Sequence, residues 1–204
     1  MKLSKLLLLL SAFFLTGFEV HIPVCNPYDA KLNLAQCEKH AEQGDARAML
    51  YVGYLYDYQH NYTNAIYWYK RATELGNANA QFNLARMYSL DSYNLLDYDK
   101  AIKLYTPLAE KGELDAQYSL GSIMHTLGQD EPVRYLDALM WFHLSAKQGY
   151  PYSQFMMGYM FEYGDGVDID YQEAKQWYKL AAEQGYEPAK ESILRVEQKA
   201  QEIE

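Results

Sequence analysis

The stretch from Ser153 to Gly185 reads SQFMMGYMFEYGDGVDIDYQEAKQWYKLAAEQG, and it decides the fold. Each of its halves carries apolar residues at helical spacing, and a Gly-Asp-Gly turn separates the two halves. Weaker copies of the stretch precede it in the chain. The glycine that ends it recurs at intervals of 36, 37, 36 and 32 residues, at Gly149, Gly112, Gly76 and Gly44. A period of this length is typical of stacked helical hairpins, because one hairpin cannot bury its apolar face alone.

Two further positions follow the same period. The second half of each copy contains a recurring alanine, at Ala65, Ala101, Ala138 and Ala174. Three residues later comes a bulky pair, at Trp68-Tyr69, Leu104-Tyr105, Trp141-Phe142 and Trp177-Tyr178. The spacing therefore predicts an all-α fold, a right-handed α-solenoid of antiparallel helical hairpins. Its four units are expected to span residues 45–76, 77–112, 113–149 and 150–185.

The units resemble Sel1-like repeats, which are relatives of the tetratricopeptide repeat. The resemblance is carried by AQYSLGSIM at residues 116–124, by SQFMMGYMFEYGDGV at 153–167 and by DYQEAKQWYKLAAEQG at 170–185. It covers residues 45–185 and is strongest in the fourth unit, since the first three lack the glycine-rich turn. The resemblance implies a protein that binds other proteins and has no catalytic role.

The chain ends are expected to differ from the repeats. Residues 1–17 contain Lys2 and Lys5, then a mostly apolar run without acidic residues, which is typical of a secretory signal peptide. The run is shorter than the roughly 20 residues of a membrane span. An uncleaved N-terminal anchor is the alternative. Residues 18–44 are predicted to form an N-terminal segment with a capping helix, and residues 186–204 a C-terminal capping helix.

The two cysteines follow the predicted signal peptide. An even number of cysteines in an exported chain favours a disulfide, so we expect Cys25 and Cys37 to be bonded. Metal binding would need further ligands, which His40 alone does not supply. Together with the signal sequence, this predicts a periplasmic or secreted bacterial protein.

The composition limits the class of partner. The chain has 27 Asp and Glu residues against 18 Lys and Arg residues, a formal net charge of −9. Nucleic-acid binding depends on clustered cationic side chains, so nucleic acid is excluded as the main partner. The membrane is expected to be contacted only through an uncleaved signal anchor. We expect a monomer that binds a peptide segment or helix of another protein.

A binding strip is predicted on the first helix of each hairpin, because helical solenoids present a concave face built from those helices. After removal of the repeat-signature positions, one face remains at spacings of three and four. It comprises Arg47, Tyr51, Tyr54, Tyr58, Asn79, Asn83, Arg86, Asp115, Ser119, Ser122, Tyr152, Met156, Tyr159 and Tyr163. The strip is aromatic at both ends and polar in the middle, and Tyr, Met and Arg are typical anchors of protein interfaces.

The sequence offers no catalytic or metal-binding motif, and no cofactor, metal or catalytic residue is expected. The histidines lack metal-ligand spacing, and Asp165, Asp168 and Asp170 do not match a calcium loop. The predicted function is a non-catalytic scaffold or adaptor of the bacterial cell envelope. One alternative is an immunity protein that neutralises a toxic effector in the periplasm. A more remote one is a cell-wall or β-lactam hydrolase, although S-x-x-K, S-D-N and K-T-G are absent.

Overall fold

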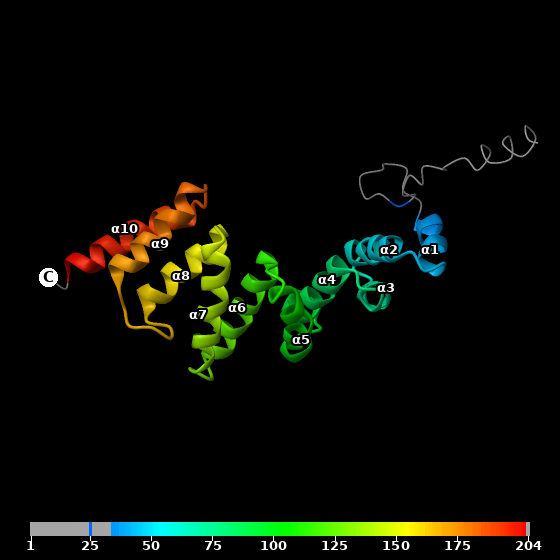
Figure 1. Cartoon of the computed structure of the whole chain (residues 1–204), viewed down its shortest axis with the longest axis horizontal. Helices are drawn as coiled ribbons and strands as arrows, with labels where there is room; N and C mark the ends of the chain where they lie inside the picture. The colour runs from blue at the N-terminus through cyan, green and yellow to red at the C-terminus, as the bar shows by residue number, and fades with distance from the viewer. Residues whose placement is uncertain (1–24, 26–33, 203–204) are drawn as a thin grey trace, which may run out of the picture.

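The computed structural model describes Cys25 and residues 34–202, and this part of the chain is helical throughout, without a strand (Figure 1). The predicted signal peptide and the start of the predicted capping helix lie outside the described residues. The elements are α1 (Leu34–Glu42), α2 (Ala46–Tyr58), α3 (Tyr62–Glu74), α4 (Ala78–Ser89), the 3₁₀ helix η1 (Asp91–Tyr93), α5 (Tyr98–Ala109), α6 (Leu114–Gly128), α7 (Arg134–Lys147), α8 (Pro151–Tyr163), α9 (Tyr171–Glu183) and α10 (Pro188–Gln201).

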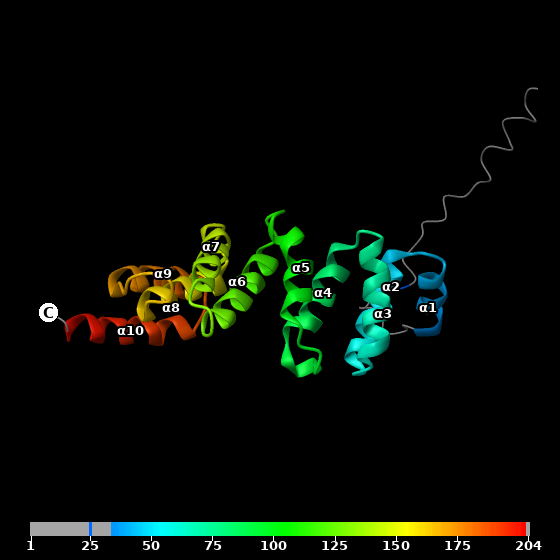
Figure 2. The same ribbon diagram turned by 90° about the horizontal axis from the view of Figure 1, so that it is seen from below.

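The helices form an elongated array in which each packs mainly against its neighbours in sequence. Figures 1 and 2 show α1 near one end of the array and α10 at the other. The pairs α2 and α3, α4 and α5, α6 and α7, and α8 and α9 are the four hairpins. The predicted all-α solenoid of helical hairpins is therefore confirmed.

The periodic glycines follow α1 and the second helix of each of the four hairpins. All five have positive φ, between +79° and +97°, a conformation that glycine adopts without steric cost. At Gly76 the backbone N–H donates to the carbonyl of Thr73 at 2.9 Å, and the next N–H, of Asn77, donates to Ala72 at 3.0 Å. These bonds satisfy carbonyls at the end of α3 and turn the chain into α4.

A second set of glycines allows the two helices of a hairpin to pack closely. A Cβ atom added to Gly53, Gly121 or Gly158 would lie 2.6 Å from an aromatic ring of the second helix. The rings are those of Tyr69, Phe142 and Tyr178, all completely buried. The fully buried rings are thus the second members of the bulky pairs, whereas Trp141 and Trp177 are only half-buried.

Buried glutamines join successive hairpins in the second half of the array. Gln117 of α6 donates to the carbonyl of Ala109 in α5 at 3.0 Å, and it accepts from Gln148 at 3.0 Å. Gln154 of α8 repeats the arrangement one unit later, with Ala146 and Gln184 as its partners. Directional hydrogen bonds therefore supplement apolar packing between these hairpins.

Two local features concern how individual helices begin and end. In the first hairpin, α2 continues to Tyr58 and α3 begins directly after Asn61, so the turn between them is short. Asn61 caps α3 with its side chain. Pro107 lies inside α5, which continues through it to Ala109. Pro107 lies near the end of α5 on an exposed face, where few following turns depend on it.

The C-terminal helix α10 is fastened to α8 by a buried carboxylate. The side chain of Glu162 is completely buried and accepts hydrogen bonds from Arg195 at 2.6 and 2.8 Å and from Lys199 at 2.9 Å. The hydroxyl of Tyr178 donates to the same carboxylate at 2.8 Å. Burial opposes ionisation, but these hydrogen bonds outweigh it and lower the pKa of Glu162 to about 2.

The N-terminal end of the array carries the predicted disulfide. Cys25 and Cys37 are bonded, with their Cα atoms 5.5 Å apart, and both side chains are buried. The bond joins the segment before α1 to α1 itself, and Tyr56 of α2 donates a hydrogen bond to Glu38 of α1. Covalent and polar contacts thus hold the first helix to the array.

Candidate partner-binding surface

The predicted binding strip lies on α2, α4, α6 and α8, and none of its fourteen residues is buried. The exposed members are Arg47, Tyr54, Tyr58, Asn79, Asp115, Tyr152 and Tyr163. The half-buried members are Tyr51, Asn83, Arg86, Ser119, Ser122, Met156 and Tyr159. The strip is therefore available to a partner along its whole length.

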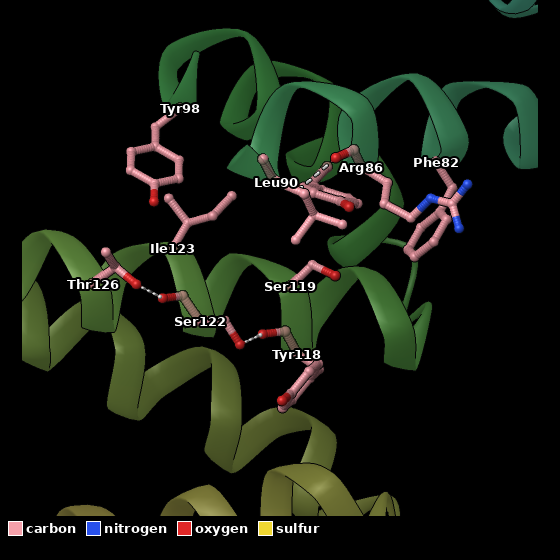
Figure 3. A pocket seen from close by; sticks show the side chains of 11 residues that line it. Phe82, Arg86, Leu90, Tyr98, Tyr118, Ser119, Ser122, Ile123 and Thr126 are labelled. Carbon is pink, nitrogen blue, oxygen red and sulfur yellow. Dashed lines mark hydrogen bonds between the residues drawn. The ribbon is translucent and has the colours of Figure 1, made fainter. Parts of the chain in front are cut away.

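The middle of the strip is a pocket between successive hairpins. The cavity has a volume of about 470 Å³ and lies where α4, α5 and α6 meet. In Figure 3, side chains of α4 and α6 face each other across it, with Phe82 towards one end and Tyr98 towards the other. Its lining consists of Phe82, Arg86, Ser89, Leu90, Tyr98, Tyr105, Tyr118, Ser119, Ser122, Ile123 and Thr126.

Only three residues of the predicted strip line this pocket, namely Arg86, Ser119 and Ser122. The expectation that the middle of the strip is polar is thus incomplete, because four aromatic rings also line the pocket. Phe82 and Tyr118 occupy equivalent positions, each two residues after the small residue that begins the repeat signature. An aromatic residue that recurs at this position of the repeat could have indicated from the sequence that these two rings line the pocket. Tyr98 and Tyr105 come from α5, the second helix of its hairpin, so the residue spacing along the first helices does not reveal them.

The serine and threonine hydroxyls at the pocket already form hydrogen bonds within their own helices. Ser119 donates to the carbonyl of Asp115 at 2.7 Å, and Ser122 donates to that of Tyr118 at 3.0 Å, both within α6. Burial raises the pKa of Tyr105, and hydrogen bonds with Ser89 and Ser119 oppose that rise. Because these serine hydroxyls have partners, an apolar group can enter the pocket without leaving them unpaired, whereas the buried Nε of Arg86 has no partner within the described part of the chain.

Within the strip, an ion pair joins the first hairpin to the second. Arg86 of α4 donates to the carboxylate of Asp57 in α2 at 2.8 Å, and the Asp57 side chain is 9% exposed. Asp57 lies between Tyr54 and Tyr58 of the strip. The guanidinium is thereby held at the edge of the pocket, and Tyr93 lies 5.9 Å from it in a cation–π arrangement.

Aromatic rings connect the third and fourth hairpins. The ring of Tyr118 lies 5.7 Å from that of Tyr150 and 5.9 Å from that of Tyr152. The hydroxyl of Tyr150 donates to the carboxylate of Asp115, and burial together with this bond raises the pKa of Tyr150. The strip residues Asp115 and Tyr152 are thus brought into one aromatic cluster. At the far end, the rings of Tyr159 and Tyr163 contact each other in a tilted arrangement, with their centroids 4.5 Å apart.

Three of the polar residues considered for chemistry, His125, Asp165 and Asp170, have structural partners. His125 lies 2.8 Å from the carboxylate of Asp165, which ties the Gly-Asp-Gly turn to α6. Asp170 caps α9 by accepting from the backbone N–H groups of Gln172 and Glu173, each at 2.9 Å. Among the described residues, no group of three potential metal ligands occurs, and no helix is long and apolar enough to cross a membrane.

Comparison with known proteins identifies the kind of repeat that this chain contains. The family model described as Sel1 repeat matches four times, at residues 46–77, 78–113, 114–150 and 151–186, which together exceed half of the chain. A search of curated protein sequences found no match.

Solved structures similar to this chain include the following two. One is a protective antigen present in uropathogenic Escherichia coli strains that displays an SLR fold. It is 37% identical with a TM-score of 0.63, over 76% of this chain and 34% of the antigen. This chain thus spans about a third of the antigen's length. The other is a Sel1 repeat protein from Oxalobacter formigenes, 24% identical with a TM-score of 0.60, over 79% of this chain and 74% of that one. The chain therefore belongs to the Sel1 repeat family, whose members are generally non-catalytic scaffolds for protein–protein interaction.

Proposed function

We propose that this protein is a non-catalytic scaffold or adaptor of the bacterial cell envelope that binds a peptide segment or helix of another protein. The partner lies along the strip on α2, α4, α6 and α8. The observation that carries the proposal is the pocket of about 470 Å³ between α4 and α6, which opens within the accessible strip. The buried glutamines between hairpins support it further, because a groove that is already ordered loses little entropy on binding.

The chemistry of the pocket favours an apolar or aromatic side chain of the partner. Phe82, Tyr98 and Ile123 supply apolar contact, and the serine hydroxyls are already hydrogen-bonded within α6. Next to the pocket on α4, the amides of Asn79 and Asn83 make no hydrogen bond within the described part of the chain. Side-chain amides both donate and accept, so these two would pair with the backbone of an extended segment.

An envelope location is supported by two observations. A disulfide joins Cys25 to Cys37, and disulfides persist mainly in oxidising compartments such as the bacterial periplasm. The similar E. coli protein is described as a protective antigen. Together with the predicted signal peptide, these observations favour a periplasmic or secreted protein. An adaptor and an immunity protein would use the same strip, so the identity of the partner distinguishes the two roles.

The test is capture of a partner from envelope extract, followed by a direct binding measurement with that purified partner. Ser122→Trp would fill the pocket, and the hydrogen bond that it removes lies within α6, so the fold should persist. We expect this variant to lose binding, as should a combined Tyr51→Ala, Tyr54→Ala, Tyr159→Ala variant.

The matched control is Tyr67→Ala, which removes an exposed ring of α3 outside the strip. It should bind like the wild type. Unchanged affinity of the folded Ser122→Trp and triple variants would contradict the proposed site.

A further inference from the structure

A row of exposed apolar side chains follows one side of α7. Val133, Leu136, Met140 and Leu144 are spaced by three, four and four residues, which places them on one face of the helix. Their exposed fractions are 66%, 55%, 47% and 42%. We call these four residues the α7 face. Single exposed apolar residues are ordinary, but a contiguous row on one helix indicates an interaction site.

The repeats provide an internal comparison for the α7 face. Alignment on the recurring alanine identifies the equivalent positions in the other three hairpins. They are His60, Thr63, Tyr67 and Arg71 in the first, Leu96, Asp99, Lys103 and Pro107 in the second, and Ile169, Gln172, Gln176 and Leu180 in the fourth. These positions are exposed throughout, apart from the half-buried Arg71. Only the third hairpin is apolar at all four, so the fold itself does not require an apolar residue there.

Unpaired charges of opposite sign stand at the two ends of the α7 face. Asp130 and Glu131 precede it, and Lys147 ends α7 one turn beyond Leu144. Between these ends, Arg134 pairs with Glu131 at 3.1 Å and lies 3.8 Å from Asp137, whereas neither Asp130 nor Lys147 has an ion-pair partner among the described residues. An identical helix running in the opposite direction would bring its basic end to this acidic end. The α7 face is thus complementary to itself.

We propose that two copies of this protein associate through the α7 face, with the two helices antiparallel and related by a two-fold axis near Met140. Each Leu136 then meets Leu144 of the second copy, and each Lys147 approaches Asp130 and Glu131 of the second copy. A two-fold contact of this kind uses the same patch on both subunits. The dimer leaves the partner-binding strip free, because that strip lies on the first helices of the hairpins.

The exposed area sets the strength of the dimer. Four partly exposed aliphatic side chains offer on the order of a few hundred Å² of apolar surface per copy, below the roughly 800 Å² of a standard stable interface. The dimer should therefore be weak and reversible. At low protein concentration the protein should be the monomer that is expected from the sequence, and the dimer should form only at high protein concentration.

Sedimentation equilibrium of the purified protein tests the association. Between about 10 µM and about 1 mM, we expect the weight-average mass to rise towards twice that of one chain. The variant Leu136→Gln, Met140→Gln introduces the residues that the fourth hairpin carries at the same positions, so it should fold normally. It should weaken the dimer at least about tenfold, because each substitution acts twice in a two-fold interface. Tyr67→Gln, at the equivalent position of α3, should leave the dimer unchanged.

Cross-linking tests the orientation. Met140→Cys should form a covalent dimer readily, since the two side chains meet at the axis. Leu136→Cys alone should link poorly, whereas a mixture of the Leu136→Cys and Leu144→Cys proteins should link well. A wild type that stays monomeric up to the highest concentration would overturn the proposal, as would a dimer that survives the double glutamine variant. Efficient linking of Leu136→Cys to itself would overturn the antiparallel arrangement.

Discussion

Replacement of Glu162 by glutamine should destabilise the C-terminal end of the array. The Glu162 carboxylate is completely buried and bonded to Arg195, Lys199 and Tyr178. Its pKa falls from 4.5 to about 2. Since a tenfold change in proton affinity is worth about 1.4 kcal/mol, the ionised group contributes about 3 kcal/mol of stability at neutral pH. Glu162→Gln keeps the size of the side chain and removes the charge, so it should lose most of this contribution.

The effect of Glu162→Gln should depend on pH in one direction. A carboxyl group whose pKa is lower in the native state stabilises the fold fully above its unfolded pKa. That stabilisation is lost as the pH falls through the native value, where the native group also binds a proton. The two proteins should therefore differ by about 3 kcal/mol at pH 7 and become similar between about pH 4.5 and pH 2.

Urea unfolding followed by circular dichroism at several pH values measures this difference. The matched control is Glu197→Gln, which removes a more exposed carboxylate of α10 that is paired with Lys175 at 2.8 Å. The control should behave like the wild type, because exposed ion pairs contribute little. A Glu162→Gln protein as stable as the wild type at pH 7, or a deficit that does not change with pH, would refute the reasoning.

Three further predictions concern the repeats and the disulfide. Gly158→Ala should cost about 1–3 kcal/mol in urea unfolding, because the new Cβ would lie 2.6 Å from the ring of Tyr178. Gly185→Ala meets no neighbouring atom but has φ of +87°, so it should cost only about 1 kcal/mol by the same measurement. Replacing Cys25 and Cys37 with serine should remove about 3 kcal/mol, seen as a lower unfolding midpoint that reduction of the wild type reproduces.

The fold could be predicted from the sequence because its determinants recur at a fixed spacing. Gly76 and its equivalents mark the end of each hairpin, and Gly158 marks a close contact with the helix that carries Tyr178. Both kinds of glycine act within a single hairpin, so the same residue is needed at the same position of each repeat. Glu162 gave no such signal, since Arg195 and Lys199 lie 33 and 37 residues away on α10.

The candidate site was less accessible to sequence reasoning. Helical spacing identified accessible residues on each first helix, but it treats one helix at a time. The pocket arises between hairpins, and its rings at Tyr98 and Tyr105 come from a second helix. The α7 face, in contrast, can be seen in the sequence, because Leu136 is apolar where its counterpart Gln172 is polar. The structure is needed to show that this position is exposed in each unit, so that an apolar residue there indicates a contact surface.

The buried glutamines have a mechanical consequence. Gln117 and Gln154 fix the last three hairpins to one another. The equivalent Gln81 of the second hairpin instead donates to the carbonyl of Leu104 within its own hairpin at 2.6 Å, so the first two hairpins are joined by the partly exposed Arg86–Asp57 pair. Under tension applied to the two ends of the chain, the array should not stretch evenly. The last three hairpins should resist as one block, and the first should separate at lower force. Single-molecule pulling would record this as an early small step that precedes a larger one.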